Sequence, residues 1–302
     1  MLRIKFISFL VGLLFIFGCE EPIDLDLKQA EEQIVVLSEF SPDEAFKVVV
    51  TKSNGILSDN TLTNEPNYVL DAEVKILKDG RINESLFLTR EESGTNSQKR
   101  LLHYSGQDPI RDRSGIYEIQ VTVPGFETVS SFDGIPEVAA PINSFTRLSY
   151  NENSNELNLK LEFEHLETNA FYHLVLTETL RNLEENETSV FPLDFVMTDS
   201  ELKYINHFGN GVLIKGEDLL FGNNQLNFKS RLFLLPELNQ RIIAELRTVS
   251  ENYFNYHSSL SFQSQQRDSI VSRPVVLFNN IENGLGNFAG YNYLRDSLLI
   301  VD

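Results

Sequence analysis

The five histidines are the side chains in this 302-residue chain best suited to metal binding or acid–base chemistry. They are scattered rather than set at a ligand spacing, at positions His103, His165, His173, His207 and His257. His165 and His173 fall on adjacent predicted strands and could approach each other, but no third ligand accompanies them. His257 lies on a predicted helix beside tyrosines, where we expect a hydrogen-bonded place in or beside the core. The sequence therefore predicts no metal site.

Paired carboxylates could cleave a glycosidic bond if their separation suited it. Glu162 and Glu164 lie on one face of a predicted strand, about 7 Å apart by strand rise. The chain has 44 acidic residues, so such pairs arise by chance. Asp24 and Asp26 lack the further ligands of a calcium loop. No nucleophile elbow, zinc-protease helix or phosphate loop occurs, so no catalytic residue, metal or cofactor is predicted.

A glycine-rich run near the end of the sequence matches the dinucleotide-binding pattern Gly-x-Gly-x-x-Gly/Ala at Gly284, Gly286 and Ala289. Too few residues follow it for the strand–helix–strand unit that a dinucleotide requires. We expect a glycine-dependent turn packed by Phe288 and Tyr291, because glycine allows backbone angles that other residues resist. A loop that contacts a ligand is the alternative.

Aromatic side chains could provide a platform for a sugar. The chain has no Trp but has 10 Tyr and 22 Phe, most of which should lie in the core. Tyr253, Tyr256, Tyr291 and Tyr293 could form an amphipathic contact patch. Whether this patch meets a ligand, a receptor or its own domain stays open, so a glycan or small-molecule ligand is left unidentified.

The one cysteine, Cys19, follows a segment typical of a secretory signal. Residues Met1 to Gly18 have a basic start, an apolar run and a small residue at the exit. The apolar run is too short to cross a bilayer permanently, since crossing takes about 20 residues. Ile16-Phe17-Gly18-Cys19 resembles the bacterial lipobox, which predicts cleavage between Gly18 and Cys19 and acylation of Cys19. The alternative is an ordinary signal with an incidental cysteine.

Charge and composition restrict the partners. The formal charge of −19 would repel nucleic acid, so we expect none as a partner. It would also repel anionic headgroups, so attachment to a membrane should come from the lipid anchor. Residues 19–33 are acidic and polar, as in a short tether, and resemble the surface-export signals of Bacteroidota lipoproteins. A solvated leader that no receptor reads is the alternative.

Period-two alternation predicts a mainly β fold of two sandwich-like domains. Residues 34–136 form the first domain, which resembles immunoglobulin-like and carboxypeptidase-regulatory-like modules. The prolines and small residues after Gly134 predict a connection, and residues 142–302 form the second domain. Ser250 is a candidate helix N-cap with Val249 and Phe254 as a hydrophobic staple, so we expect a helix over about 251–263. Residues 274–278 are predicted to form a short strand.

These motifs together resemble the domain-of-unknown-function family 4249. The resemblance rests on Cys-x-x-x-Ile-Asp-Leu-Asp-Leu, the Ala-x-Val-x-Ile hairpin, Gly-x-Tyr with Val-Pro-Gly-Phe, and Asn-Ile-x-Asn-Gly-Leu-Gly-x-Phe-Ala-Gly-Tyr. It spans nearly the whole chain, and Asn287 departs from the apolar residue expected before Phe288. It implies a Bacteroidota envelope lipoprotein encoded beside TonB-dependent outer-membrane receptors, with no catalytic residues to carry over.

The sequence thus leads to three expectations about function. The first is a lipid-anchored outer-membrane protein, facing the cell surface, that acts as a non-catalytic accessory or ligand-binding partner of a TonB-dependent transporter. The alternative is a structural or adhesive envelope protein that binds a neighbouring protein or glycan. A hydrolase of unfamiliar type comes last.

Overall fold

The structure is a computed structural model of the chain, and it describes residues 31–53, 66–92, 100–165, 167–182, 187–207, 211–235, 237–266 and 276–300. The predicted signal peptide, Cys19 and most of the predicted tether lie outside these residues. Within them, no helix is both long enough and apolar enough to span a membrane.

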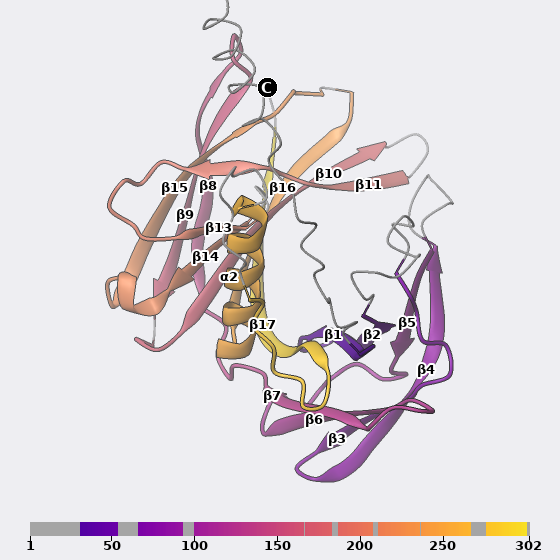
Figure 1. Cartoon of the computed structure of the whole chain (residues 1–302). Helices are drawn as coiled ribbons and strands as arrows, with labels where there is room; N and C mark the ends of the chain where they lie inside the picture. Colours follow the sequence, from indigo (N-terminus) through magenta and orange to yellow (C-terminus); the bar gives the residue numbers. More distant parts are fainter. Residues whose placement is uncertain are drawn as a thin grey trace, which may run out of the picture.

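The first half of the chain folds into seven strands of one sheet, which curls around a core (Figure 1). The strands are β1 (Ile34–Phe40), β2 (Lys47–Lys52), β3 (Glu73–Lys78), β4 (Arg81–Glu92), β5 (Arg100–Ser105), β6 (Ile116–Thr122) and β7 (Val129–Gly134). Their order in space is β1-β2-β5-β4-β3-β6-β7. Alternate residues of β6, such as Tyr117, Ile119 and Val121, face the core, as the period-two pattern predicts.

The second half contributes strands to two sheets that pack face to face. The strands are β8 (Ile142–Asn151), β9 (Glu156–His165), β10 (Phe171–Asn182), β11 (Glu187–Pro192), β12 (Phe195–Met197), β13 (Ile205–His207), β14 (Gly211–Lys215), β15 (Gly222–Arg231), β16 (Asn239–Val249) and β17 (Leu285–Leu299). β12-β15-β9-β8 form a four-stranded sheet. Its apolar face packs against β10, β14 and β16 of the large sheet to form a second core. The predicted mainly β, sandwich-like fold is confirmed.

The last strand joins the two halves. β17 pairs antiparallel with β16 and parallel with β1, so it joins strands from both halves into one 13-stranded sheet. Ile281 and Phe288, from the second half of the sequence, lie in the core of the first half. The predicted division into two domains at residues 136–142 stays a prediction, because β17 contributes to both halves.

Helix α2 (Glu251–Gln266) covers the face of the large sheet opposite the second core (Figure 1). It begins as the sequence predicts: Ser250 Oγ accepts a hydrogen bond from the backbone N–H of Tyr253 at 3.2 Å. Val249 and Phe254 lie in one buried cluster, as expected for a hydrophobic staple. The helix ends three residues later than the predicted boundary near Gln263.

One expectation for the C-terminal segment is wrong, and another holds only in part. Residues 276–278 form no strand, while Pro274 and Val275 lie outside the described residues. The predicted glycine-dependent turn is short, because strand β17 begins already at Leu285 and includes Gly286, Phe288 and Tyr291. The glycines instead allow the backbone of β17 to lie very close to neighbouring backbone. A Cβ atom at Gly286, where φ is +123°, would lie 1.9 Å from the carbonyl oxygen of Val36 on β1.

Candidate functional site

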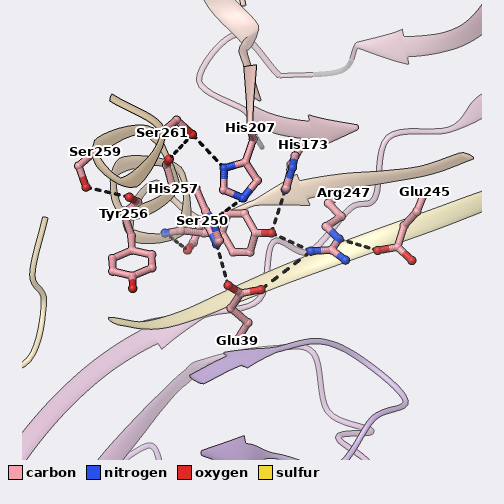
Figure 2. A network of polar contacts seen from close by, with 11 residues as sticks. Glu39, His173, His207, Glu245, Arg247, Ser250, Tyr256, His257, Ser259 and Ser261 are labelled. Atoms are coloured by element: carbon pink, nitrogen blue, oxygen red, sulfur yellow. Dashed lines mark hydrogen bonds and ion pairs between the residues drawn. The ribbon is translucent and has the colours of Figure 1, made fainter. Parts of the chain in front are cut away.

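A polar network lies between helix α2 and the large sheet (Figure 2). The helix contributes Tyr253, His257 and Ser261, each at most 7% exposed. Facing them are side chains from β1, β10, β13 and β16: Glu39, His173, His207, Glu245 and Arg247. The alternation of each strand places these residues on the face that the helix covers. We call this set the α2 network.

Arg247 is the positive centre of the α2 network. Its Nε donates to Glu245 at 2.5 Å, and one terminal nitrogen donates to the Tyr253 hydroxyl at 2.8 Å. The same nitrogen lies 3.9 Å from Glu39, and the guanidinium stacks 4.6 Å from the ring centroid of Tyr291. Arg295 donates to the second oxygen of Glu245. Two arginines and two glutamates therefore balance each other's charge.

The histidines form two hydrogen-bonded branches. In one branch, Nε2 of His257 lies 2.7 Å from Glu39, and Nδ1 of His257 lies 3.3 Å from Nε2 of His207. Nδ1 of His207 then lies 2.9 Å from the hydroxyl of Ser261. In the other branch, the Tyr253 hydroxyl accepts from Arg247 and so directs its own proton to Nδ1 of His173, 2.9 Å away. This bond fixes His173 as the neutral tautomer with its proton on Nε2.

Burial and neighbouring charge keep two of these histidines neutral. Burial lowers the pKa of His173 well below its ordinary value, and the positive charge of Arg247 lowers it further. Burial, together with repulsion from a charged His257, lowers the pKa of His207 to about 4. Burial alone would raise the pKa of Glu39, but the hydrogen bond from His257 and the charge of Arg247 outweigh it, so the pKa of Glu39 is lowered.

These shifts predict that acid destabilises the fold. Between about pH 6.5 and pH 4, unfolded His173 and His207 bind protons that the folded protein excludes, so stability is complete above about pH 6.5 and falls as pH drops. The lowered pKa of Glu39 adds a further loss below its ordinary value of 4.5. We expect urea unfolding to show a loss on the order of 3 kcal/mol between about pH 7.5 and pH 4.5.

A His207→Asn variant is the control for this prediction. Asparagine does not titrate in this range, so part of the pH dependence should disappear even if the variant starts from a lower stability. Equal pH slopes for the variant and the wild-type protein would show that His207 does not contribute.

His165 and His173 do not approach each other, and neither takes part in a metal site among the described residues. His165 ends β9 in the four-stranded sheet, and its Nδ1 lies 2.8 Å from the hydroxyl of Tyr172. Tyr172 and His173 are consecutive on β10 and point to opposite faces of that strand. His173 instead lies near His207 and His257, with ring centroids 5.0 and 5.9 Å away. Among the described residues, no group of three potential ligands is arranged to hold a metal ion.

The four tyrosines do not form the exposed patch considered above. Tyr253 is fully buried beneath helix α2, and Tyr291 is 8% exposed and covered by Arg247. Tyr256 and Tyr293 are half-buried. The Tyr253 hydroxyl is occupied by Arg247 and His173, so this side chain belongs to the α2 network rather than to a sugar platform.

The remaining candidate residues have separate places. Glu162 accepts hydrogen bonds from Lys160 and Ser144, and the bond from Lys160 is the main cause of its lowered pKa. Its predicted partner, Glu164, lies on the same strand β9. His103 is buried on β5, two strands beyond β1 in the large sheet, and does not belong to the α2 network. Asn287 is 1% exposed on β17, and its amide has no hydrogen-bond partner among the described residues.

A second polar contact links the first half of the chain to helix α2. Asp133, at the end of β7, accepts hydrogen bonds from the Ser250 hydroxyl at 2.5 Å and from the Gly290 backbone N–H at 3.0 Å. Ser250, which caps helix α2, is therefore itself hydrogen-bonded to the first half of the chain. The Glu39–His257 and Asp133–Ser250 contacts together fix the helix, which belongs to the second half, to the first half.

Strand β11 presents a different kind of surface. It forms an edge of the large sheet beside β10, and all six of its residues are exposed. Two of them are large and apolar: Val190 is 60% exposed and Phe191 is 46% exposed. An exposed edge strand offers unpaired backbone groups to another chain, and apolar side chains on it favour such pairing. We call these six residues the β11 edge.

Comparison with known proteins gives one informative match. The model of the family described as "Domain of unknown function (DUF4249)" matches residues 20–297. No curated protein matches the sequence. Among solved structures, the crystal structure of the collagen binding domain of Erysipelothrix rhusiopathiae surface protein RspB is similar at 10% identity, over 89% of this chain and 95% of that one. Its TM-score is 0.17, so it carries no argument about fold or function.

Proposed function

The chain belongs to the DUF4249 family, and from this premise we propose that it is a lipid-anchored outer-membrane protein that acts as a non-catalytic accessory of a TonB-dependent transporter. The lipobox-like segment ending at Cys19 supports the anchor, and the acidic residues after it support exposure at the cell surface. The β11 edge is the observation that supports a protein partner.

The chemistry of the β11 edge suits such a partner. An added strand would take up the free backbone groups of β11, while Val190 and Phe191 would bury apolar surface at about 25 cal/mol per Å². The α2 network, by contrast, is enclosed except at Glu39, and its groups hydrogen-bond mainly to one another. We therefore assign partner binding to the β11 edge and a structural role to the network.

The test is affinity purification in mild detergent from the native membrane, followed by mass spectrometry. We expect a TonB-dependent transporter to co-purify with the wild-type protein. A Val190→Ser/Phe191→Ser variant should recover at least about tenfold less transporter, because apolar anchors dominate such interfaces. The matched control is Leu220→Ser/Phe221→Ser, since these side chains are 77% and 74% exposed and lie outside the β11 edge.

Three outcomes would contradict parts of this proposal. If no transporter co-purifies with the wild-type protein, the structural or adhesive alternative replaces the accessory function. If both double variants lose the transporter equally, the β11 edge is not the binding surface. If a Cys19→Ala variant still pellets with membranes and carries labelled palmitate, the anchor is wrong.

A further inference from the structure

The hydrogen bonds around His207 and His257 can be completed in two ways that differ by one proton (Figure 2). Both rings lie in an unbroken chain from Glu39 to Ser261, with contacts of 2.7, 3.3 and 2.9 Å. Each contact needs one donor and one acceptor, so the proton positions along the chain depend on each other.

In the first state both rings are neutral. The carboxylate of Glu39 can only accept, so His257 must donate from Nε2. Its Nδ1 then accepts a proton from Nε2 of His207. Nδ1 of His207, left without a proton, accepts from the hydroxyl of Ser261.

In the second state the chain holds one more proton. The hydroxyl of Ser261 turns to donate to the backbone carbonyl of His257, 2.8 Å away, and its oxygen becomes an acceptor. The added proton lies on Nδ1 of His207 and is donated to Ser261. The proton formerly on Nε2 of His207 moves to Nδ1 of His257, which becomes an imidazolium beside Glu39. No proton is lost, and every contact again has one donor and one acceptor.

We propose that Glu39, His257, His207 and Ser261 form a proton-binding site that takes up a single proton by this shift. Glu39 is the exposed end of the site, with 36% of its side chain exposed, whereas both histidine rings are enclosed. The alternative position for the Ser261 proton is supplied by the helix itself, since Ser261 lies one turn after His257.

The surroundings explain why one proton is accepted and a second is opposed. Glu39 favours a charge on His257, while Arg247 lies on the far side of that carboxylate and its own charge is balanced by Glu245. A second charge on His207 would repel the first across 3.3 Å. The charged and titratable side chains that face the pair come from every element packed around it: Glu39 of β1, His173 of β10, Glu245 and Arg247 of β16, Tyr253 and Tyr256 of α2, and Tyr291 of β17.

Proton uptake would strengthen the contact between the two halves of the chain. Glu39 lies on β1 and His257 on α2, so the added proton converts a hydrogen bond to a neutral ring into a charge-assisted one. The inference is independent of the proposed partner, because it concerns only side chains within this chain.

The test is a pH titration of the 15N-labelled wild-type protein, from about pH 8 to about pH 4.5, that follows the ring nitrogens by two-bond 1H–15N correlation. We expect His257 to become an imidazolium while His207 stays neutral and exchanges its Nε2–H tautomer for the Nδ1–H tautomer. The proposal is overturned if His207 keeps its tautomer, or if both rings become charged together.

Two alanine variants on the same helix separate this site from general electrostatics. Ser261→Ala removes the acceptor for Nδ1 of His207, so the tautomer exchange should be blocked and the proton affinity of the pair should fall about tenfold. Ser258→Ala is the matched control, because Ser258 is also buried and its hydroxyl has no hydrogen-bond partner among the described residues. Equal effects of the two variants would overturn the proposal.

Discussion

A Gly286→Ala variant is expected to lose more than about 3 kcal/mol of folding free energy. Two penalties coincide at this position. Its φ of +123° is a conformation that L-residues rarely adopt, and the new methyl group would lie 1.9 Å from the carbonyl oxygen of Val36. Relief of this clash requires β17 to move away from β1, which would break the parallel pair that joins the two halves.

Urea unfolding of the mature chain measures this effect. Gly125→Ala is the control, because Gly125 also has a positive φ of +86° but a Cβ atom there would meet nothing within 4 Å. The control should lose only about 1 kcal/mol, the cost of backbone strain alone. If Gly286→Ala costs no more than the control, close approach of β17 to β1 is not essential to the fold.

An Arg247→Met variant is expected to lose about 3 kcal/mol, because it leaves the carboxylates of Glu39 and Glu245 without their shared cation. It also removes the donor that holds the Tyr253 hydroxyl and the cation stacked on Tyr291. Glu245 keeps Arg295 in this variant, whereas Glu39 keeps only His257 among the described residues and can be neutralised by protonation. The difference in stability from the wild-type protein should therefore be smaller at about pH 5 than at about pH 8.

The matched control for this variant is Arg241→Met, on the same strand β16. Arg241 is exposed and, among the described residues, donates a hydrogen bond only to Asn239, so its loss should cost less than about 0.5 kcal/mol. A loss for Arg247→Met that does not depend on pH would contradict the view that the Glu39 carboxylate, deprived of Arg247, contributes to it.

Local signals in the sequence predicted a large part of the fold. The alternation in β6, β9 and β16 corresponds to one face in a core, and Ser250 begins the helix as expected. Strand β14 cannot be predicted in this way, because Val212, Leu213 and Ile214 are all buried, on both faces of the sheet, so no period-two pattern exists. The glycines of β17 predict a turn, but in the structure they allow close approach of neighbouring backbone rather than chain reversal.

The α2 network could not be predicted from the sequence. His173, His207 and His257 lie on β10, β13 and α2, and their spacing along the chain matches no ligand motif. They meet because β13 pairs with β14, β14 pairs with β10, and the helix crosses all three. Glu39 is more distant still, since it reaches the helix only through the pairing of β1 with β17.

The parallel pair of β1 and β17 also bears on the order of folding. Val35 pairs with Leu285, 250 positions later in the chain, and the ring of Phe288 stacks on that of Phe40 at 4.5 Å. The half that is synthesised first therefore cannot complete its core until nearly the whole polypeptide is available. Such long-range contacts slow folding, because a large loop must close before they form. For the exported protein proposed above, such a delay would favour passage through a secretion channel before folding.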